Sequence, residues 1–196
     1  MDFDVEGAAV GDTVSVNLRS AALASLQAKE AAAGHPITIS LTLPVLPQGL
    51  PQAELAVIQS SVKAGVTLSV VNVMAMDYGD GPAPNPSGKM GTYAIDAGKS
   101  TEAQLAVIFP NATTAQLWAM VGVTPMVGLN DLTTEIFTTA DATTLANWAK
   151  TQGIGRLAMW SISRDAPCAG NAVVGSNTCS GTSQTPYQFS QILNAG

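Results

Sequence analysis

Three carboxylic acids alternate with apolar residues at the start of the chain, MDFDVEG (1–7). Because side chains of a strand point alternately to its two faces, Asp2, Asp4 and Glu6 share one face, about 6.5–7 Å from one to the next. In a buried setting, like charges and burial both raise a carboxyl pKa, so at least one is expected to hold a proton. A protonated carboxyl beside a cleft can act as a general acid. The alternative is a surface edge strand with solvated acids.

The elements that must position these acids alternate between strand-like and helix-like segments. β-Branched and apolar runs predict strands at 1–7, 37–50, 66–81, 120–131 and 156–165. Helical spacing and stop signals predict helices at 13–33, 52–65, 100–109, 113–119, 138–155 and 187–194. The segment 82–98 is rich in proline and glycine and is expected to be a long loop.

This βα alternation is typical of a parallel sheet with helices packed outside it, here in a single domain spanning 1–196. Four of the five strands end in polar residues, at Glu6, MDYGD (76–80), GLND (128–131) and SISRD (161–165). In α/β barrels functional groups lie at the carboxyl ends of the strands. The polar ends therefore predict a site at that edge of the sheet.

Composition excludes several classes of protein. Hydrophobic residues make up 46% and charged residues 11% of the 196 residues, which excludes a disordered chain. The net charge is −6 with eight scattered basic residues, so nucleic acid is not an expected partner. No apolar run reaches the length of a membrane span. The single His35 has no Ser or Cys constellation around it, so we expect no metal, no cofactor and no catalytic triad.

Cys168 and Cys179 lie in a segment rich in glycine, asparagine and serine. Their spacing suits a small loop-closing disulfide, which would imply an oxidising compartment and a secreted, extracellular protein. The sequence shows no signal peptide, and the abrupt start inside a strand is expected to reflect either a truncated gene or fragment or a genuine partial barrel that folds alone.

DFDVEG (2–7) resembles the fourth-strand signature of glycoside hydrolase family eighteen, the chitinase family, written D-G-x-D-x-D-x-E. Asp2, Asp4 and Glu6 match its last three acids, and its first Asp and Gly have no counterpart. VNVMAMDYG (71–79), TPMVGLND (124–131) and LAMWSISRD (157–165) resemble the sixth, seventh and eighth strands of bacterial chitinases. The tail CSGTSQTPYQFSQIL (179–193) resembles the end of such domains.

The resemblance implies a substrate-assisted, retaining hydrolysis in which the 2-acetamido oxygen of the sugar is the nucleophile. Glu6 would protonate the leaving oxygen and then activate water. Asp4 would orient the acetamido N–H, and Asp2 would lie deeper and share a proton with Asp4. Tyr78 would donate to the acetamido carbonyl, and Met76 would line the acetamido pocket.

Other implied contacts have structural alternatives. Trp160 would lie under the sugar at the cleavage point, or be plain core. Asp77 would face either the site or the barrel wall. Tyr78 could anchor a loop, and Met76 and Met126 could be core. Asn130 and Asp131 could contact sugar or cap the next helix, whereas Trp118 and Trp148 are expected to pack helices on the sheet.

The matches cover only strands four to eight, so the fold class expected is α/β, a partial TIM (β/α) barrel of about five parallel strands with outer helices. Its open edges and apolar inner face would favour a homo-oligomer that covers the open side. The expected partner is chitin or its oligosaccharides, cleaved with reduced activity. The alternatives are an endo-β-N-acetylglucosaminidase and a non-hydrolytic chitin-binding protein.

Overall fold

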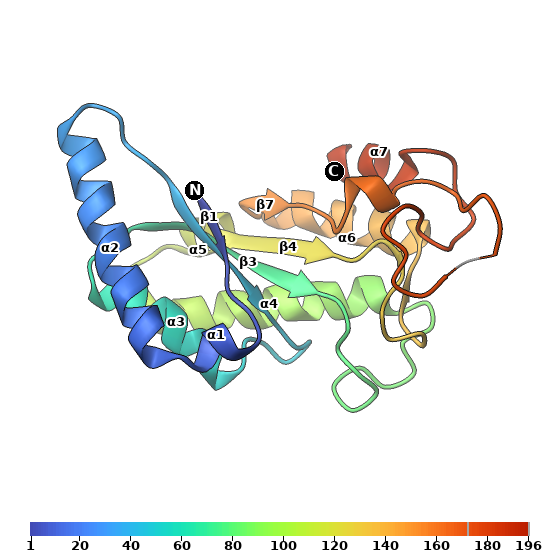
Figure 1. Cartoon of the computed structure of the whole chain (residues 1–196), viewed down its shortest axis with the longest axis horizontal. Coiled ribbons are helices and arrows are strands. Elements are labelled where there is room, and N and C mark those ends of the chain that lie inside the picture. Colours follow the sequence, from blue (N-terminus) through green and yellow to red (C-terminus); the bar gives the residue numbers. More distant parts are fainter. Residues whose placement is uncertain (172, 196) are drawn as a thin grey trace.

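Five parallel strands form one sheet in the order β1-β2-β3-β4-β7 in the computed structural model, which describes residues 1–171 and 173–195 (Figure 1). The strands are β1 (Asp2–Asp4), β2 (Ile39–Pro44), β3 (Leu68–Ala75), β4 (Val121–Pro125) and β7 (Arg156–Leu157). All four pairings are parallel. The predicted α/β class and the parallel sheet of five strands are confirmed.

The helices lie in the predicted order between the strands. They are α1 (Ala8–Gly11), α2 (Thr13–Ala32), α3 (Gln52–Lys63), α4 (Met90–Ile108), α5 (Thr114–Met120), α6 (Thr139–Gln152) and α7 (Gln188–Asn194). A 3₁₀ turn covers Ile162–Arg164. A separate antiparallel pair joins β5 (Gly128–Leu129) to β6 (Ile136–Phe137).

The two faces of the sheet differ in polarity. On β2, Ile39, Leu41 and Leu43 are fully buried in the core, while the residues between them, Ser40 and Thr42, carry hydroxyls on the other face. This alternation follows from the twofold repeat of a strand. The face opposite the core is therefore the polar one, and it positions the site described below.

Helix α4 begins at Met90, ten residues before the predicted start, so the expected loop over 82–98 is wrong in its second half. The helix contains Gly91 and Gly98, whose lack of a side chain lets α4 pack closely on α6. A Cβ on Gly98 would lie 2.6 Å from the ring of Trp148, and one on Gly91 would lie 2.8 Å from the carbonyl oxygen of Asp141. Thr101 is fully buried inside this helix.

The last two predicted strands are shorter in the structure. The segment 120–131 leaves the main sheet after Pro125, and only Gly128 and Leu129 are extended again, in β5. Gly128 has φ 80, and a Cβ there would lie 1.9 Å from the carbonyl oxygen of Ser180, so no other residue fits this close approach. Of 156–165, Arg156–Leu157 form β7, and Trp160 adds a single parallel bridge to Met126.

The predicted helix packing of two tryptophans is confirmed. The rings of Trp118 on α5 and Trp148 on α6 meet edge to face, with centroids 5.7 Å apart. Helix α6 begins with a capping box in which Thr138 and Asp141 exchange side-chain and backbone hydrogen bonds. These contacts fix α5 and α6 against the strands between which they run.

The Cys168–Cys179 disulfide is present and closes the loop before α7. Beneath this loop, the fully buried Asp165 accepts hydrogen bonds from the backbone N–H groups of Phe189 and Ser190, at 3.0 and 2.7 Å, and from Gln184 at 2.7 Å. The carboxylate thus joins the end of the last strand segment to the first turn of α7.

Asp165 gives the fold a specific pH dependence. Burial alone would raise its pKa, but hydrogen bonds from Ser190, Phe189 and Gln184 outweigh this and lower the pKa. A depressed folded-state pKa means that the stabilisation is complete above the unfolded carboxyl pKa of about 3.9 and is lost as pH falls through the folded value. Asp165→Asn should cost about 1–3 kcal/mol at neutral pH.

Thermal melts between neutral and acid pH test this expectation. The difference in melting temperature between the two proteins should shrink as the pH is lowered below about 4. A difference that stays constant with pH would show that the Asp165 charge does not contribute.

Each outer strand of the described sheet has one partner, β2 for β1 and β4 for β7. The predicted self-association is not tested by a single chain and stays a prediction. No helix within the described residues is long and apolar enough to cross a membrane.

Candidate active site

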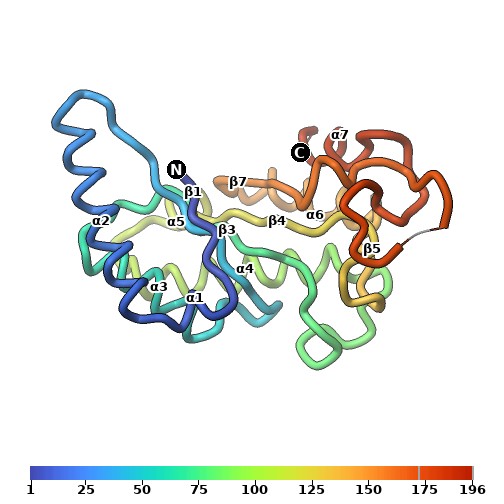
Figure 2. The backbone as a smooth tube through the Cα atoms, in the orientation of Figure 1, coloured from blue at the N-terminus to red at the C-terminus, as the bar shows by residue number. Residues whose placement is uncertain are grey.

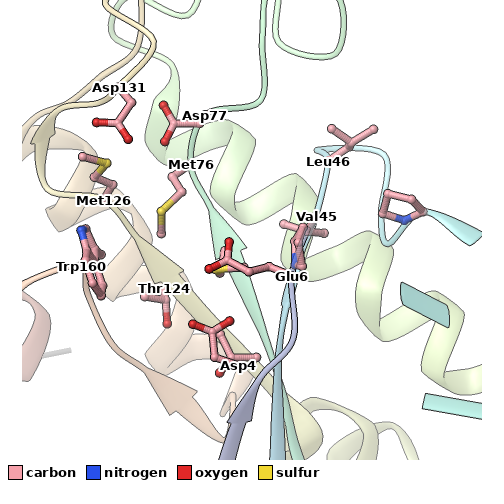
Figure 3. Close-up of a pocket in the computed structure, with 14 residues that line it drawn as sticks. Asp4, Glu6, Val45, Leu46, Met76, Asp77, Thr124, Met126, Asp131 and Trp160 are labelled. Carbon is pink, nitrogen blue, oxygen red and sulfur yellow. The ribbon is translucent and has the colours of Figure 1, made fainter. Parts of the chain in front are cut away.

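A cleft of about 510 Å³ opens at the carboxyl ends of the five parallel strands, where the polar strand ends were predicted to meet (Figure 3). It is lined by acids, methionines, small apolar residues and one tryptophan, namely Asp4, Glu6, Thr42, Pro44, Val45, Leu46, Pro51, Met74, Met76, Asp77, Thr124, Met126, Asp131 and Trp160. Six of the nine predicted site residues are among them.

Asp4 and Glu6 form one wall of the cleft. Strand β1 ends at Asp4, and Glu6 follows in the turn before α1, where Gly7 takes φ 57. Figure 3 shows the Glu6 side chain extending into the cleft from this turn. Both residues are exposed, and neither carboxylate has a hydrogen-bond partner among the described residues. They are therefore accessible to a ligand.

Asp2 does not line the cleft, and the predicted proton sharing with Asp4 does not fit its contacts. Its carboxylate accepts hydrogen bonds from Ser40 at 2.6 Å and Thr42 at 2.9 Å, and pairs with Arg156 at 3.1 Å. Burial would raise its pKa, but these donors and the charge of Arg156 lower it. Asp2 is therefore held as an anion by its own donors, and these contacts do not fit the shared proton that the resemblance implied.

Asp77 lines the cleft, whereas the side chain of Tyr78, the next residue, is buried in the core. Strand β3 ends at Ala75, and Asp77 takes φ 49, which breaks the alternation of faces. Met76 and Asp77 line the cleft, whereas Tyr78 is 5% exposed and its ring packs edge to face on Tyr93, with centroids 6.4 Å apart. The predicted contact of Tyr78 with an acetamido group therefore does not fit, and its alternative as a loop anchor does.

The fully buried Glu135 holds this turn in place. Its carboxylate accepts hydrogen bonds from the backbone N–H groups of Tyr78, at 3.1 Å, and Gly79, at 2.8 Å. Burial raises the pKa of Glu135, and the two backbone donors partly offset this. Sequence reasoning missed Glu135, because no local pattern shows that an acid will bind backbone more than fifty residues away.

Asp131 joins Asp77 at the end of the cleft away from Asp4. Figure 3 shows their carboxyl groups turned toward one another. Burial and the charge of Asp131 raise the pKa of Asp77, while a hydrogen bond from the backbone N–H of Leu132, at 2.9 Å, lowers it. The alternative of a sugar contact for Asp131 is thus compatible with its position, and α6 is capped by Thr138 instead.

Asn130, in contrast, does not reach the cleft. It is fully buried, and its amide donates to the carbonyl oxygens of Met126 and Gly128, both at 3.0 Å. It stabilises the turn between β4 and β5, so its predicted place in the substrate site is wrong, since none of its atoms is accessible.

Trp160 presents an aromatic ring to the cleft opposite Glu6 (Figure 3). Its backbone is held between Pro125 and Val127 by hydrogen bonds of 2.8 Å on each side, and it bridges to Met126, which also lines the cleft. The side chain is nevertheless 52% exposed, which excludes plain core as its role. An open, fixed indole suits the apolar face of a sugar ring.

The polar groups that line this cleft are the carboxylates and the hydroxyls of Thr42 and Thr124. Within residues 1–171 and 173–195 no group of three or more His, Cys, Asp and Glu is arranged to hold a metal ion. The geometry supports acid–base chemistry, in which Glu6 can exchange a proton with a ligand held on Trp160.

The sequence of this chain is similar to parts of proteins named as chitinases. The chain is 36% identical over 200 residues to a probable bifunctional chitinase/lysozyme of Escherichia coli K12, covering 98% of this chain and 22% of the relative. It is 38% identical over 176 residues to endochitinase 11 of Metarhizium anisopliae, covering 86% of this chain and 33% of the relative. No protein-family model matches the chain.

Solved structures give the same result for the fold. The catalytic domain of a hyperthermophilic chitinase from Pyrococcus furiosus superposes with a TM-score of 0.83 at 32% identity, over 99% of this chain and 59% of that one. A catalytic-site mutant of active domain 2 of a Pyrococcus furiosus chitinase, complexed with chito-oligosaccharides, gives 0.78 at 31% identity, over 99% of this chain and 58% of that one.

The chain spans a third or less of the two curated relatives and about three fifths of these structures. Over nearly its whole length, it is thus similar in sequence and in fold to part of the catalytic domain of chitinases.

Proposed function

We propose that this chain acts as a chitinase-type glycoside hydrolase of family eighteen, cleaving β-1,4-linked N-acetylglucosamine polymers. The observation that carries the proposal is the cleft itself, in which Glu6 extends toward a site bordered by the exposed ring of Trp160. The similarity to a chitinase structure complexed with chito-oligosaccharides supports the same substrate class.

The proposed mechanism uses one acid and the substrate's own acetamido group. Glu6 donates its proton to the leaving glycosidic oxygen as the acetamido oxygen attacks the anomeric carbon. The cyclic intermediate carries positive charge, which the neighbouring Asp4 carboxylate stabilises. Water, deprotonated by Glu6, then opens the intermediate with net retention. No protein nucleophile and no cofactor are needed in this scheme.

A comparison of two substrates tests this mechanism. Soluble oligosaccharides of N-acetylglucosamine should be cleaved, whereas fully deacetylated oligosaccharides of the same length should not, because they lack the attacking oxygen. Products separated by chromatography and weighed by mass spectrometry would show the difference. Equal cleavage of both substrates would contradict the substrate-assisted mechanism.

Trp160 should contribute chiefly to substrate binding. Trp160→Ala should weaken the binding of a chitin oligosaccharide about 10- to 100-fold, since a central aromatic contact accounts for about 1–3 kcal/mol. Trp160→Phe should restore part of the affinity, and Val107→Ala, an exposed change on α4, should have no effect. Titration calorimetry measures the three constants, and an unchanged affinity for Trp160→Ala would exclude this contact.

We further propose that the chain works in an oxidising, extracellular setting. The support is the Cys168–Cys179 disulfide, since such bonds persist outside reducing compartments.

A further inference from the structure

A row of polar side chains crosses the face of the sheet opposite the core. In register, Asp4 on β1 pairs with Thr42 on β2, Thr42 with Asn72 on β3, Asn72 with Gly122 on β4, and Gly122 with Arg156 on β7. Thr124 donates to Asn72 at 3.0 Å, and Asn72 donates to Thr42 at 3.1 Å. The row thus connects strands that are far apart in sequence.

The donors in this network point toward Asp2, either directly or through Thr42 or Ser40. Thr42 uses its single hydroxyl proton on Oδ2 of Asp2, and Ser40 uses its own on Oδ1. Arg156 donates to Ser40 at 3.0 Å and pairs with Oδ1 of Asp2 at 3.1 Å. Both Asp2 oxygens are therefore acceptors. Asp4, two residues on, has no such donor among the described residues.

The contact between Arg156 and Asp2 joins the two outer strands of the sheet. In a flat sheet, β1 and β7 would be about 19 Å apart, four spacings of about 4.8 Å, which is beyond the reach of an arginine. The contact therefore requires a strongly curved sheet, and Figure 2 shows β7 beginning near the N-terminal start of β1. Gly122 leaves room for the side chain of Arg156 to cross the sheet. A Cβ at position 122 would lie 3.1 Å from the Cβ of Arg156 and 2.8 Å from Oδ1 of Asn72.

We propose that Arg156 is a positioning residue of the cleft, which neutralises Asp2 across the curved sheet so that Asp4 is the acid on this face left for the sugar. This inference rests on the proposed function. Arg156 touches no cleft atom, and it acts on the reaction only through Asp2. The lowered pKa of Asp2 is consistent with this role.

The charges that face Asp2 and Asp4 decide the expected pH effect. They are Arg156 on β7, which pairs with Asp2, the Met1 amino group, which donates to the Thr38 carbonyl oxygen, and Glu6 in the cleft; Asp77 and Asp131 lie at the far end of the cleft. Without Arg156, Asp2 loses one of the partners that lower its pKa, so its carboxylate takes up a proton at higher pH and no longer holds Ser40 and Thr42 as an acceptor. The loss of activity must therefore be largest on the acid side.

The first test is the pH profile of kcat/KM for Arg156→Met on a chitin oligosaccharide. We expect a loss of about tenfold at about pH 5 and about twofold at about pH 8, since one lost interaction of about 1.4 kcal/mol is tenfold in rate. Arg156→Lys should restore much of the acid-side activity. In the Asp2→Asn background, Arg156→Met should no longer change the ratio between the two pH values. A uniform loss, as expected for a purely structural residue, would overturn the proposal.

A second test does not depend on hydrolysis. The carboxyl group of Asp2 can be titrated by carbon-detected NMR in the wild-type chain and in Arg156→Met, and its midpoint should rise in the variant, because Arg156 lowers the pKa of Asp2. If Arg156→Met does not fold, Ser40→Ala removes the hydroxyl that joins Arg156 to Asp2 and should move the midpoint in the same direction. An unmoved midpoint would overturn the role of Arg156, whereas an inactive wild type with a moved midpoint would overturn only the proposed function.

Discussion

Glu6→Gln should abolish nearly all hydrolysis of chitin oligosaccharides while leaving their binding intact. The amide is isosteric with the acid but has no transferable proton, and general acid–base catalysis contributes about 10²–10⁴-fold to such reactions. Glu6 extends into the cleft without a hydrogen-bond partner, so its replacement removes no structural contact. We therefore expect kcat to fall by that factor and the dissociation constant to change little.

The control is Glu102→Gln, an isosteric change on α4 outside the cleft that should leave both quantities unchanged. Rates of product release and calorimetric binding constants for the three proteins provide the comparison. Equal rates for wild type and Glu6→Gln would remove Glu6 from the mechanism. Binding without hydrolysis by the wild type would favour the non-hydrolytic chitin-binding alternative.

Glu135→Ala should produce the largest loss of stability among the changes near the cleft. The truncation leaves the buried backbone N–H group of Tyr78 and the partly buried one of Gly79 without an acceptor. Each unsatisfied buried group costs about 1–3 kcal/mol, so we expect about 2–5 kcal/mol in the free energy of unfolding. Because Glu135 fixes the turn that carries Met76 and Asp77, activity should fall as well.

Two variants give this experiment its reference points. Glu135→Gln keeps one acceptor and should lose about half as much, whereas Glu102→Ala on α4 should stay within about 0.5 kcal/mol of the wild type. Denaturant unfolding measures all three. A Glu135→Ala variant as stable as Glu102→Ala would show that the turn at 77–79 does not depend on the buried carboxylate.

The sheet and most helices follow from local patterns in the sequence, because each rests on periodicity that the chain carries itself. The start of α4 could not be predicted in this way. Gly91 and Gly98 read locally as helix breakers, and only their close contacts with Asp141 and Trp148 on α6 explain why they lie inside a helix. The same holds for Gly128, whose neighbour Ser180 is far along the chain.

Cleft residues could be predicted where a strand, or the end of a strand, determines which face of the sheet the side chain points to, as for Asp4, Met76 and Trp160. The sequence could not decide between the two alternatives for Tyr78, because the left-handed Asp77 shifts the alternation by one residue and turns the Tyr78 side chain into the core. The prediction was wrong for the proton state of Asp2, because the compensating Arg156 lies 154 residues away and approaches only when the sheet curves.

The most direct test of the central claim is the anomeric form of the first product released from a chitin hexasaccharide, followed by proton NMR with the wild-type chain. The substrate-assisted mechanism through Glu6 predicts that the new reducing end appears first as the β-anomer and only later mutarotates. An α-anomer formed first, or no product from a chain shown by circular dichroism to be folded, would contradict it.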